Sequence, residues 1–216
     1  MKKKQKIIII IALIVMLIGM SVGFAAFSTN ISISSSAGVA PSATDFHIKF
    51  SSSESSVVTG QITPSTSGAT GEKATLNNSG TMPTISGLKA NFTAPGQSVT
   101  YTFYVHNTGD YSAYLKNIIF ENASGKSSNK ACTKTDSTAT DSLVAAACNS
   151  ISITAKVGAT TYSQTTNSIT NHSLAAKNGK ETIVVTISYA SGGSKADGDF
   201  SVAFGDIKLE YKSTDA

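Results

Sequence analysis

The feature that most constrains the fold is a run of alternating apolar and polar residues inside residues 92–120. Such a period of two, carried by aromatic and β-branched residues, is typical of a β-strand that buries one face. The Asn-Thr-Gly-Asp sequence at residues 107–110 is typical of a tight turn. We therefore expect an antiparallel hairpin whose second strand is residues 113–120. The apolar face of the first strand consists of Val99, Tyr101, Phe103 and Val105.

The same alternation recurs along the chain. We expect further strands at residues 46–50, 150–157, 181–189 and 200–211. In the last of these the apolar parity changes at Gly205, so a β-bulge or bend there would direct both halves into one core. Residues 51–80 are rich in Ser, Thr and Gly and predict only short strands and loops.

Helix formers cluster in one place, residues 141–148, where we expect a short helix, and residues 121–140 are expected to be a polar connection. About seven strands with turn signals between them predict an all-β fold, an antiparallel β-sandwich of the jelly-roll type. The expected core consists of Phe46, Ile48, Phe50, Val99, Tyr101, Phe103, Val105, Ile183, Val185, Ile187, Phe200, Val202 and Phe204.

The N-terminus has the pattern of an export signal. Four lysines within residues 1–6 precede residues 7–27, which contain no charged residue. A run of about 20 apolar residues can span a membrane as a retained helical anchor, whereas small residues at its end are typical of a cleaved signal peptide. Cleavage between Ala26 and Phe27 is favoured over retention. We thus divide the chain into a signal or anchor (1–26), a strand and linker (27–43) and a sandwich domain (44–216).

The charge distribution argues against nucleic-acid binding. The chain has 17 lysines and no arginine, and the four lysines before residue 7 account for the whole net charge: 17 − 4 = 13 lysines against 13 acidic residues. The remaining lysines are scattered and form no basic stripe that would neutralise phosphates. We expect no nucleic-acid partner.

The two cysteines, Cys132 and Cys148, enclose a loop that one disulfide would close. In an exported protein this is the default interpretation. The alternative, two unpaired thiols, stays open at this point, because some bacteria export proteins without an efficient oxidase.

No catalytic or metal-binding signature is present. The three histidines, His47, His106 and His172, are isolated in sequence, and there is no H-E-x-x-H or G-x-S-x-G motif. Residues 197–199 (Asp-Gly-Asp) lack the other oxygen ligands of a calcium loop and are typical of a turn. The sequence therefore predicts neither an enzyme nor a cofactor.

Three segments resemble the TasA and camelysin family of exported bacterial proteins. They are residues 23–30 (GFAAFSTN), residues 94–118 (APGQSVTYTFYVHNTGDYSAYLKNI) and residues 206–216 (DIKLEYKSTDA). The resemblance covers about a quarter of the chain. It implies a jelly-roll subunit of extracellular matrix fibres, processed by a dedicated signal peptidase. The camelysin branch is associated with metallopeptidase activity, but this chain lacks the H-E-x-x-H motif.

The leading hypothesis is a secreted or cell-surface fibre subunit that assembles head-to-tail with copies of itself. Residues 27–36 read as a short strand, with Phe27, Ile31 and Ile33 on one side, joined to the domain by a small-residue linker. After cleavage, this strand would add to a sheet edge of the next subunit. The alternatives are a surface binding module held in the membrane by residues 7–27 and, least favoured, a metallopeptidase.

Overall fold

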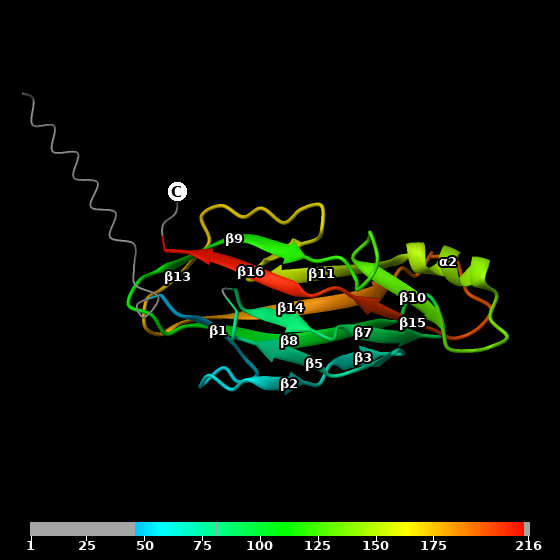
Figure 1. Ribbon diagram of the computed structural model, residues 1–216, viewed down its shortest axis with the longest axis horizontal. Helices are drawn as coiled ribbons and strands as arrows, with labels where there is room; N and C mark the ends of the chain where they lie inside the picture. Colours follow the sequence, from blue (N-terminus) through cyan, green and yellow to red (C-terminus); the bar gives the residue numbers. More distant parts are fainter. Residues whose placement is uncertain (1–45, 81, 214–216) are drawn as a thin grey trace, which may run out of the picture. The chain divides into compact units, whose positions relative to one another are not determined.

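The computed structural model describes residues 46–80 and 82–213, and these residues fold into antiparallel β-sheets with one short helix (Figure 1). This confirms the expected all-β class, and an antiparallel sandwich fits the arrangement. The predicted N-terminal helix, the cleavage position Ala26 and Phe27, and the assembly residues Ile31 and Ile33 lie outside the described residues.

The first layer is a sheet built around two long antiparallel strands, β8 and β14, which pair along almost their whole length. Their length follows from the uninterrupted alternation of apolar and polar residues in both segments. The strands, in spatial order, are β1 (Ile48–Ser51), β8 (Ser98–Asn107), β14 (Gly179–Tyr189), β11 (Ile151–Val157) and β12 (Thr160–Tyr162), with β3 (Ser65–Ser67) also paired to β8.

The second layer contains two sheets. The strands of the first, in order, are β13 (Ser173–Leu174), β9 (Ala113–Phe120), β16 (Ile207–Lys212), β6 (Thr84–Ser86), β5 (Ala74–Asn77) and β2 (Gly60–Ile62). Those of the second are β10 (Lys130–Lys134), β15 (Phe200–Phe204), β7 (Lys89–Phe92) and β4 (Thr70–Gly71). Two chain segments run from one sheet into the other, β6 into β7 and β15 into β16, so the two sheets form one interrupted layer.

The interruption lies at Gly205, where the sequence predicts a bulge or bend. The Phe204 N–H donates to the Leu88 carbonyl (2.9 Å) and the Gly205 N–H donates to the Asn129 carbonyl (3.0 Å). A Cβ on Gly205 would lie 2.5 Å from the Asn122 carbonyl oxygen and still closer to that of Glu121. The chain bends here and changes sheet, so apolar residues of both parities reach the core. The irregularity in pairing falls later, between Glu210 and Tyr211.

The core lies between the layers, where alternating side chains of both meet. Eleven of the residues expected in the core are buried, while Phe46 and Ile48 are partly buried and pack against it. An aromatic cluster joins the layers: Phe92 and Phe200 of the second layer contact Tyr189 of the first, with ring centroids 5.7 and 5.8 Å from that of Tyr189. Within the first layer, the rings of Phe50 and Phe103 pack in a tilted arrangement, with their centroids 4.8 Å apart.

The expected hairpin at residues 92–120 is wrong in its pairing. Both strands exist, but β8 pairs with β1, β3 and β14, whereas β9 pairs with β13 and β16 of the other layer. Asn107 holds the crossing between layers, since its side chain accepts from the Gly109 N–H (3.1 Å) and donates to the carbonyls of Tyr111 (2.8 Å) and Ala175 (3.0 Å). The alternating pattern determines which face of a strand is buried, but it does not determine which strand lies beside it. Two strands in opposite layers, facing each other across the core, show the same pattern as two strands paired in a hairpin.

The helix α2 (Asp141–Asn149) confirms the helix expected at residues 141–148. The short strands β2 to β5 confirm the interpretation of residues 51–80. The interpretation of residues 121–140 as a connection is incomplete, because β10 lies within it and pairs with β15. The sequence of β10, Lys-Ala-Cys-Thr-Lys, has no alternation of apolar and polar residues, so it did not indicate a strand. β10 is an edge strand whose residues are half-buried or exposed, and it therefore needs no apolar face.

Candidate functional site

The helix α2 is attached to the sandwich at its N-terminal end by Asp197. The carboxylate of Asp197 accepts from the Thr140 N–H (2.9 Å) and from the Thr140 hydroxyl (2.5 Å). These hydrogen bonds, from the side chain first and then the backbone, lower the pKa of Asp197. Asp141 stands in the first turn, where a negative charge interacts favourably with the helix dipole. Val144 and Ala147 bury the inner face of the helix.

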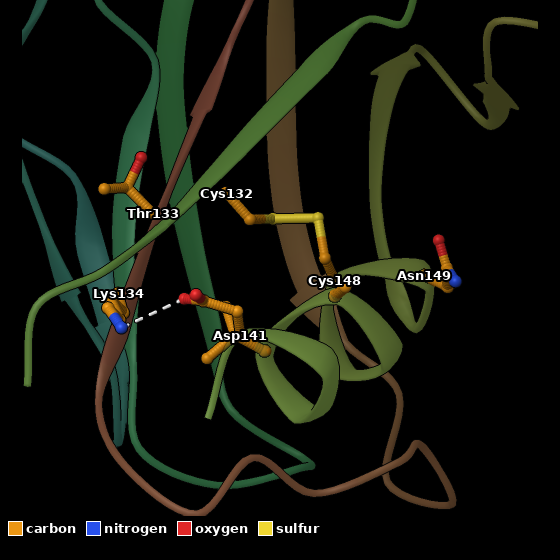
Figure 2. A pocket seen from close by; sticks show the side chains of 8 residues that line it. Cys132, Thr133, Lys134, Asp141, Cys148 and Asn149 are labelled. Carbon is orange, nitrogen blue, oxygen red and sulfur yellow. Dashed lines mark ion pairs between the residues drawn. A yellow bond between two sulfur atoms is a disulfide. The ribbon is translucent and has the colours of Figure 1, made fainter. Parts of the chain in front are cut away.

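A disulfide attaches the other end of α2. Cys148 of the helix is bonded to Cys132 of β10, with an S–S distance of 2.02 Å and a Cα–Cα distance of 6.1 Å (Figure 2). The described residues include no free cysteine. The bond joins α2 to the edge strand of the second layer.

An open hollow of about 510 Å³ lies between α2 and β10 (Figure 2). The Lys134 ammonium and the Asp141 carboxylate form an ion pair at 3.1 Å across it. Most of its exposed lining is apolar. The residues that line it are Cys132, Thr133, Lys134, Asp141, Val144, Ala145, Cys148 and Asn149.

Lys130 connects three elements behind this hollow. Its ammonium donates to the Cys148 carbonyl at the end of α2 (2.7 Å) and to the Ile151 carbonyl at the start of β11 (2.5 Å). Burial of the side chain lowers the pKa of Lys130. A hydrogen bond from a charged donor is stronger than one between neutral groups, so Lys130 ties the edge strand of the second layer to β11 of the first layer.

Beyond Lys130, the first half of β11 forms an open edge. β12 pairs only with Ala155–Val157, and no other described strand pairs with residues 151–154 on that side. We call residues 151–154 the open edge; the Ile151 carbonyl within it already accepts from Lys130. A hollow of about 190 Å³ lies beside it. It is lined by Asn129, Ile151, Ser152, Ile153, Ser163, Gln164, Thr165 and Phe204.

A polar cluster lies at the start of β14. Glu181 shares the inward parity of Ile183, and its carboxylate lies 2.6 Å from His172 Nε2. The Tyr211 hydroxyl is buried and has no hydrogen-bond partner among the described residues. Burial, with a further contribution from the negative charge of Glu181, raises the pKa of Tyr211 well above its ordinary value. The contact between His172 and Glu181 thus attaches the segment that contains His172 to β14 of the sandwich.

The other histidines lie apart from this cluster. The backbone carbonyl of His47 accepts from the Thr108 N–H (2.9 Å), and His106 Nε2 lies 2.9 Å from the Ser53 carbonyl. Within residues 46–80 and 82–213, no group of three or more His, Cys, Asp or Glu side chains is placed to hold a metal ion. In the 197–199 segment, the Asp199 carbonyl accepts from the Thr135 N–H (3.0 Å), and Asp197 attaches α2 as described above.

Three residues that shape these sites were not singled out from the sequence: Lys130, Glu181 and Tyr211. Glu181 was detectable in principle, because it continues the buried parity of a clear strand with a charged residue. The roles of Lys130 and Tyr211 could not be predicted from the sequence, because the residues that they contact belong to other elements, distant along the chain.

Comparisons with protein families, with curated proteins and with solved structures found no match to this chain. In the part of the chain that the structure describes, no helix is long and apolar enough to cross a membrane.

Proposed function

We propose that this chain is a secreted or cell-surface structural subunit of extracellular matrix fibres, built as a jelly-roll sandwich and assembled head-to-tail through residues 27–36. The observation that carries the proposal is the open edge of β11 with an adjacent hollow. The sequence predicts a short strand at residues 27–36 that could pair with such an edge. Strand addition to such an edge is a common way for a chain to bind an extended segment.

The open edge suits an alternating strand. Ile151 and Ile153 are buried at this edge, so a strand added beside them would place alternate side chains against the same core. In an extended strand, Ile31 and Ile33 of residues 27–36 would share one side. Ile153 of the open edge lines the adjacent hollow. A head-to-tail contact whose rotation does not close a ring propagates into a filament.

Export is the second component of the proposal. Signal peptidase is expected to cut between Ala26 and Phe27 and so free the strand, whereas the uncut chain would stay in the membrane through residues 7–27. Mass spectrometry of the cell-associated protein gives its first residue. A mature chain beginning at Phe27 supports the proposal, and a retained Met1 supports the membrane-anchored binding module.

The assembly test uses two matched variants of the processed protein. Replacing both Ile31 and Ile33 by Asp places charges on the face that would be buried, so we expect a folded monomer that forms no filaments in electron microscopy. Replacing Ser32 and Ser34 by Asp adds the same charge to the opposite face and should leave filaments intact. Ordinary filaments from the first variant contradict assembly through this strand.

The acceptor edge is tested by adding a synthetic peptide of residues 27–36 to protein that lacks them. Hydrogen exchange should show new protection at residues 151–154, because the added strand would bond to backbone groups there. A peptide with Asp in place of Ile31 and Ile33 is the control. Protection confined to β2 or β13 would place the acceptor on a different edge.

A further inference from the structure

The outward face of the first layer carries hydroxyl side chains in two rows that cross four strands. β3, β8, β14 and β11 pair in a register that aligns them. We call these two rows of Ser and Thr side chains the hydroxyl rows. The first row consists of Ser67, Ser98, Ser188 and Ser152, and the second consists of Ser65, Thr100, Thr186 and Thr154.

The rows form a regular array. Neighbouring strands lie about 4.8 Å apart, and residues two positions apart along one strand are about 6.8 Å apart. Within the rows, the hydroxyls of Ser152 and Ser188 lie 3.1 Å apart and those of Thr100 and Thr186 lie 3.4 Å apart. Ser65, Ser67 and Ser152 are exposed and the other members are half-buried. A hydroxyl both donates and accepts, so the face presents repeated donors and acceptors.

The hydroxyl rows contain no ionisable side chain, which sets them apart from the outward face of the second layer. There, Lys208 pairs with Glu121, and Lys212 pairs with Glu210 at 3.5 Å. The carboxylate of Glu210 also accepts from the Asn117 side chain (2.7 Å). A charged partner is attracted by complementary charge. The rows themselves offer none, although Lys156 of β11 is exposed on the same side, two positions beyond Thr154. They therefore match a neutral partner that is itself rich in hydroxyl groups.

One end of this face is closed by the segment that follows β1. The carbonyl of Ser53 lies against His106, and the Lys180 ammonium donates to the Glu54 carbonyl (3.2 Å). Tyr104, half-buried, lies on the same outward side of β8, between the rows and this closed end. The open part of the face is thus bounded by an aromatic ring, a common element of ligand sites that combine an apolar surface with polar groups.

We propose that the hydroxyl rows bind an extended neutral polysaccharide. The hydroxyls of the sugar chain would exchange hydrogen bonds with successive Ser and Thr side chains. Each contact is weak, but a polymer that engages several at once binds through their combined effect. This inference goes beyond the proposed fibre function and does not depend on it, because a single folded subunit carries the complete face.

The test is cosedimentation of the exported protein with three insoluble neutral polysaccharides, cellulose, chitin and a β-1,3-glucan, in low and in 1 M salt. We expect binding to at least one, little changed by salt because no ion pair is involved. Replacing Thr100, Thr154 and Thr186 by Val removes three hydroxyls and keeps β-branched side chains, and it should weaken binding at least tenfold. The matched control is replacement of Thr75 and Thr84 by Val on the second layer, which should bind as the unmodified protein does.

Circular dichroism melts establish that both variants are folded, and electron microscopy records filaments separately. Binding without filaments contradicts the fibre proposal and leaves this inference standing, while filaments without binding do the reverse. The inference is overturned if the protein binds none of the three polysaccharides or if the triple variant binds equally well. It is also overturned if the protein pellets without polysaccharide and the triple variant abolishes that pelleting, since the rows would then pack against a second copy.

Discussion

At the scale of single residues, neighbouring side chains of β8 alternate between the buried core and the exposed face. Phe103 is fully buried against Phe50, whereas Thr102 beside it is exposed. The same alternation places Thr100 in the hydroxyl rows and Tyr101 in the core. The Tyr101 hydroxyl lies 2.9 Å from the carbonyl oxygens of both Glu72 and Lys89, and its single proton is donated to this pair. Burial raises the pKa of Tyr101 above its ordinary value.

Replacing Phe103 by Ala should reduce the free energy of unfolding by about 3–5 kcal/mol, because it leaves a cavity in a closely packed core. Replacing Thr102 by Ala on the same strand should change it by no more than about 0.5 kcal/mol, as is usual for an exposed site. Denaturant titrations measure both. A loss below about 1 kcal/mol for the first variant would mean that the side chain does not pack as described.

At the scale of elements, α2 and β10 depend on each other. The helix buries only Val144 and Ala147, and β10 pairs on one side only, with β15. The disulfide and Lys130 therefore supply attachments that neither element makes through apolar packing. Both elements lie beside the open edge, so their position matters to the proposed assembly.

The disulfide should be formed in the exported protein, and intact-mass measurement after alkylation without reduction should show no modified cysteine. Replacing both Cys132 and Cys148 by Ser should lower the free energy of unfolding by about 3 kcal/mol, the value for a closed loop near 15 residues. Two alkylated thiols in unreduced protein would contradict the bond. A denaturation midpoint that is the same for the double variant and for the parent would contradict its contribution to stability.

At the scale of the whole described domain, the second layer is divided along one line. The breaks between β6 and β7 and between β15 and β16 lie side by side, joined by the hydrogen bond from Phe204 to Leu88. The loop after β9 reaches the same line, where the Glu121 N–H donates to the Asp206 carbonyl (2.9 Å). Burial, with the charge of Glu121 adding to it and that of Lys208 opposing it, raises the pKa of Asp206. At these aligned breaks the second layer changes direction, while the apolar core beneath it stays continuous.

Replacing Gly205 by Ala should destabilise the domain by about 1–3 kcal/mol or more, because the added methyl group meets the carbonyls of Glu121 and Asn122 and backbone must move. Gly192, where an added Cβ has nothing within 4 Å, is the matched control and should tolerate Ala. Thermal melts of the two variants compare them directly. Equal melting temperatures would contradict the close approach at Gly205.

The sequence alone determined the secondary structure and the burial of most strands, because alternation and turn residues act within a few positions of the chain. It indicated the all-β class, the helix at residues 141–148, the change of parity at Gly205 and most of the core. It could not determine which strands pair, as the assignment of β8 and β9 to one hairpin shows, because partners come from distant segments. The tertiary structure alone decided the open edge, the setting of Lys130, the contact of Glu181 with His172 and the alignment of the hydroxyl rows. Each of these depends on register between strands far apart in sequence, and a one-residue shift in that register would remove it.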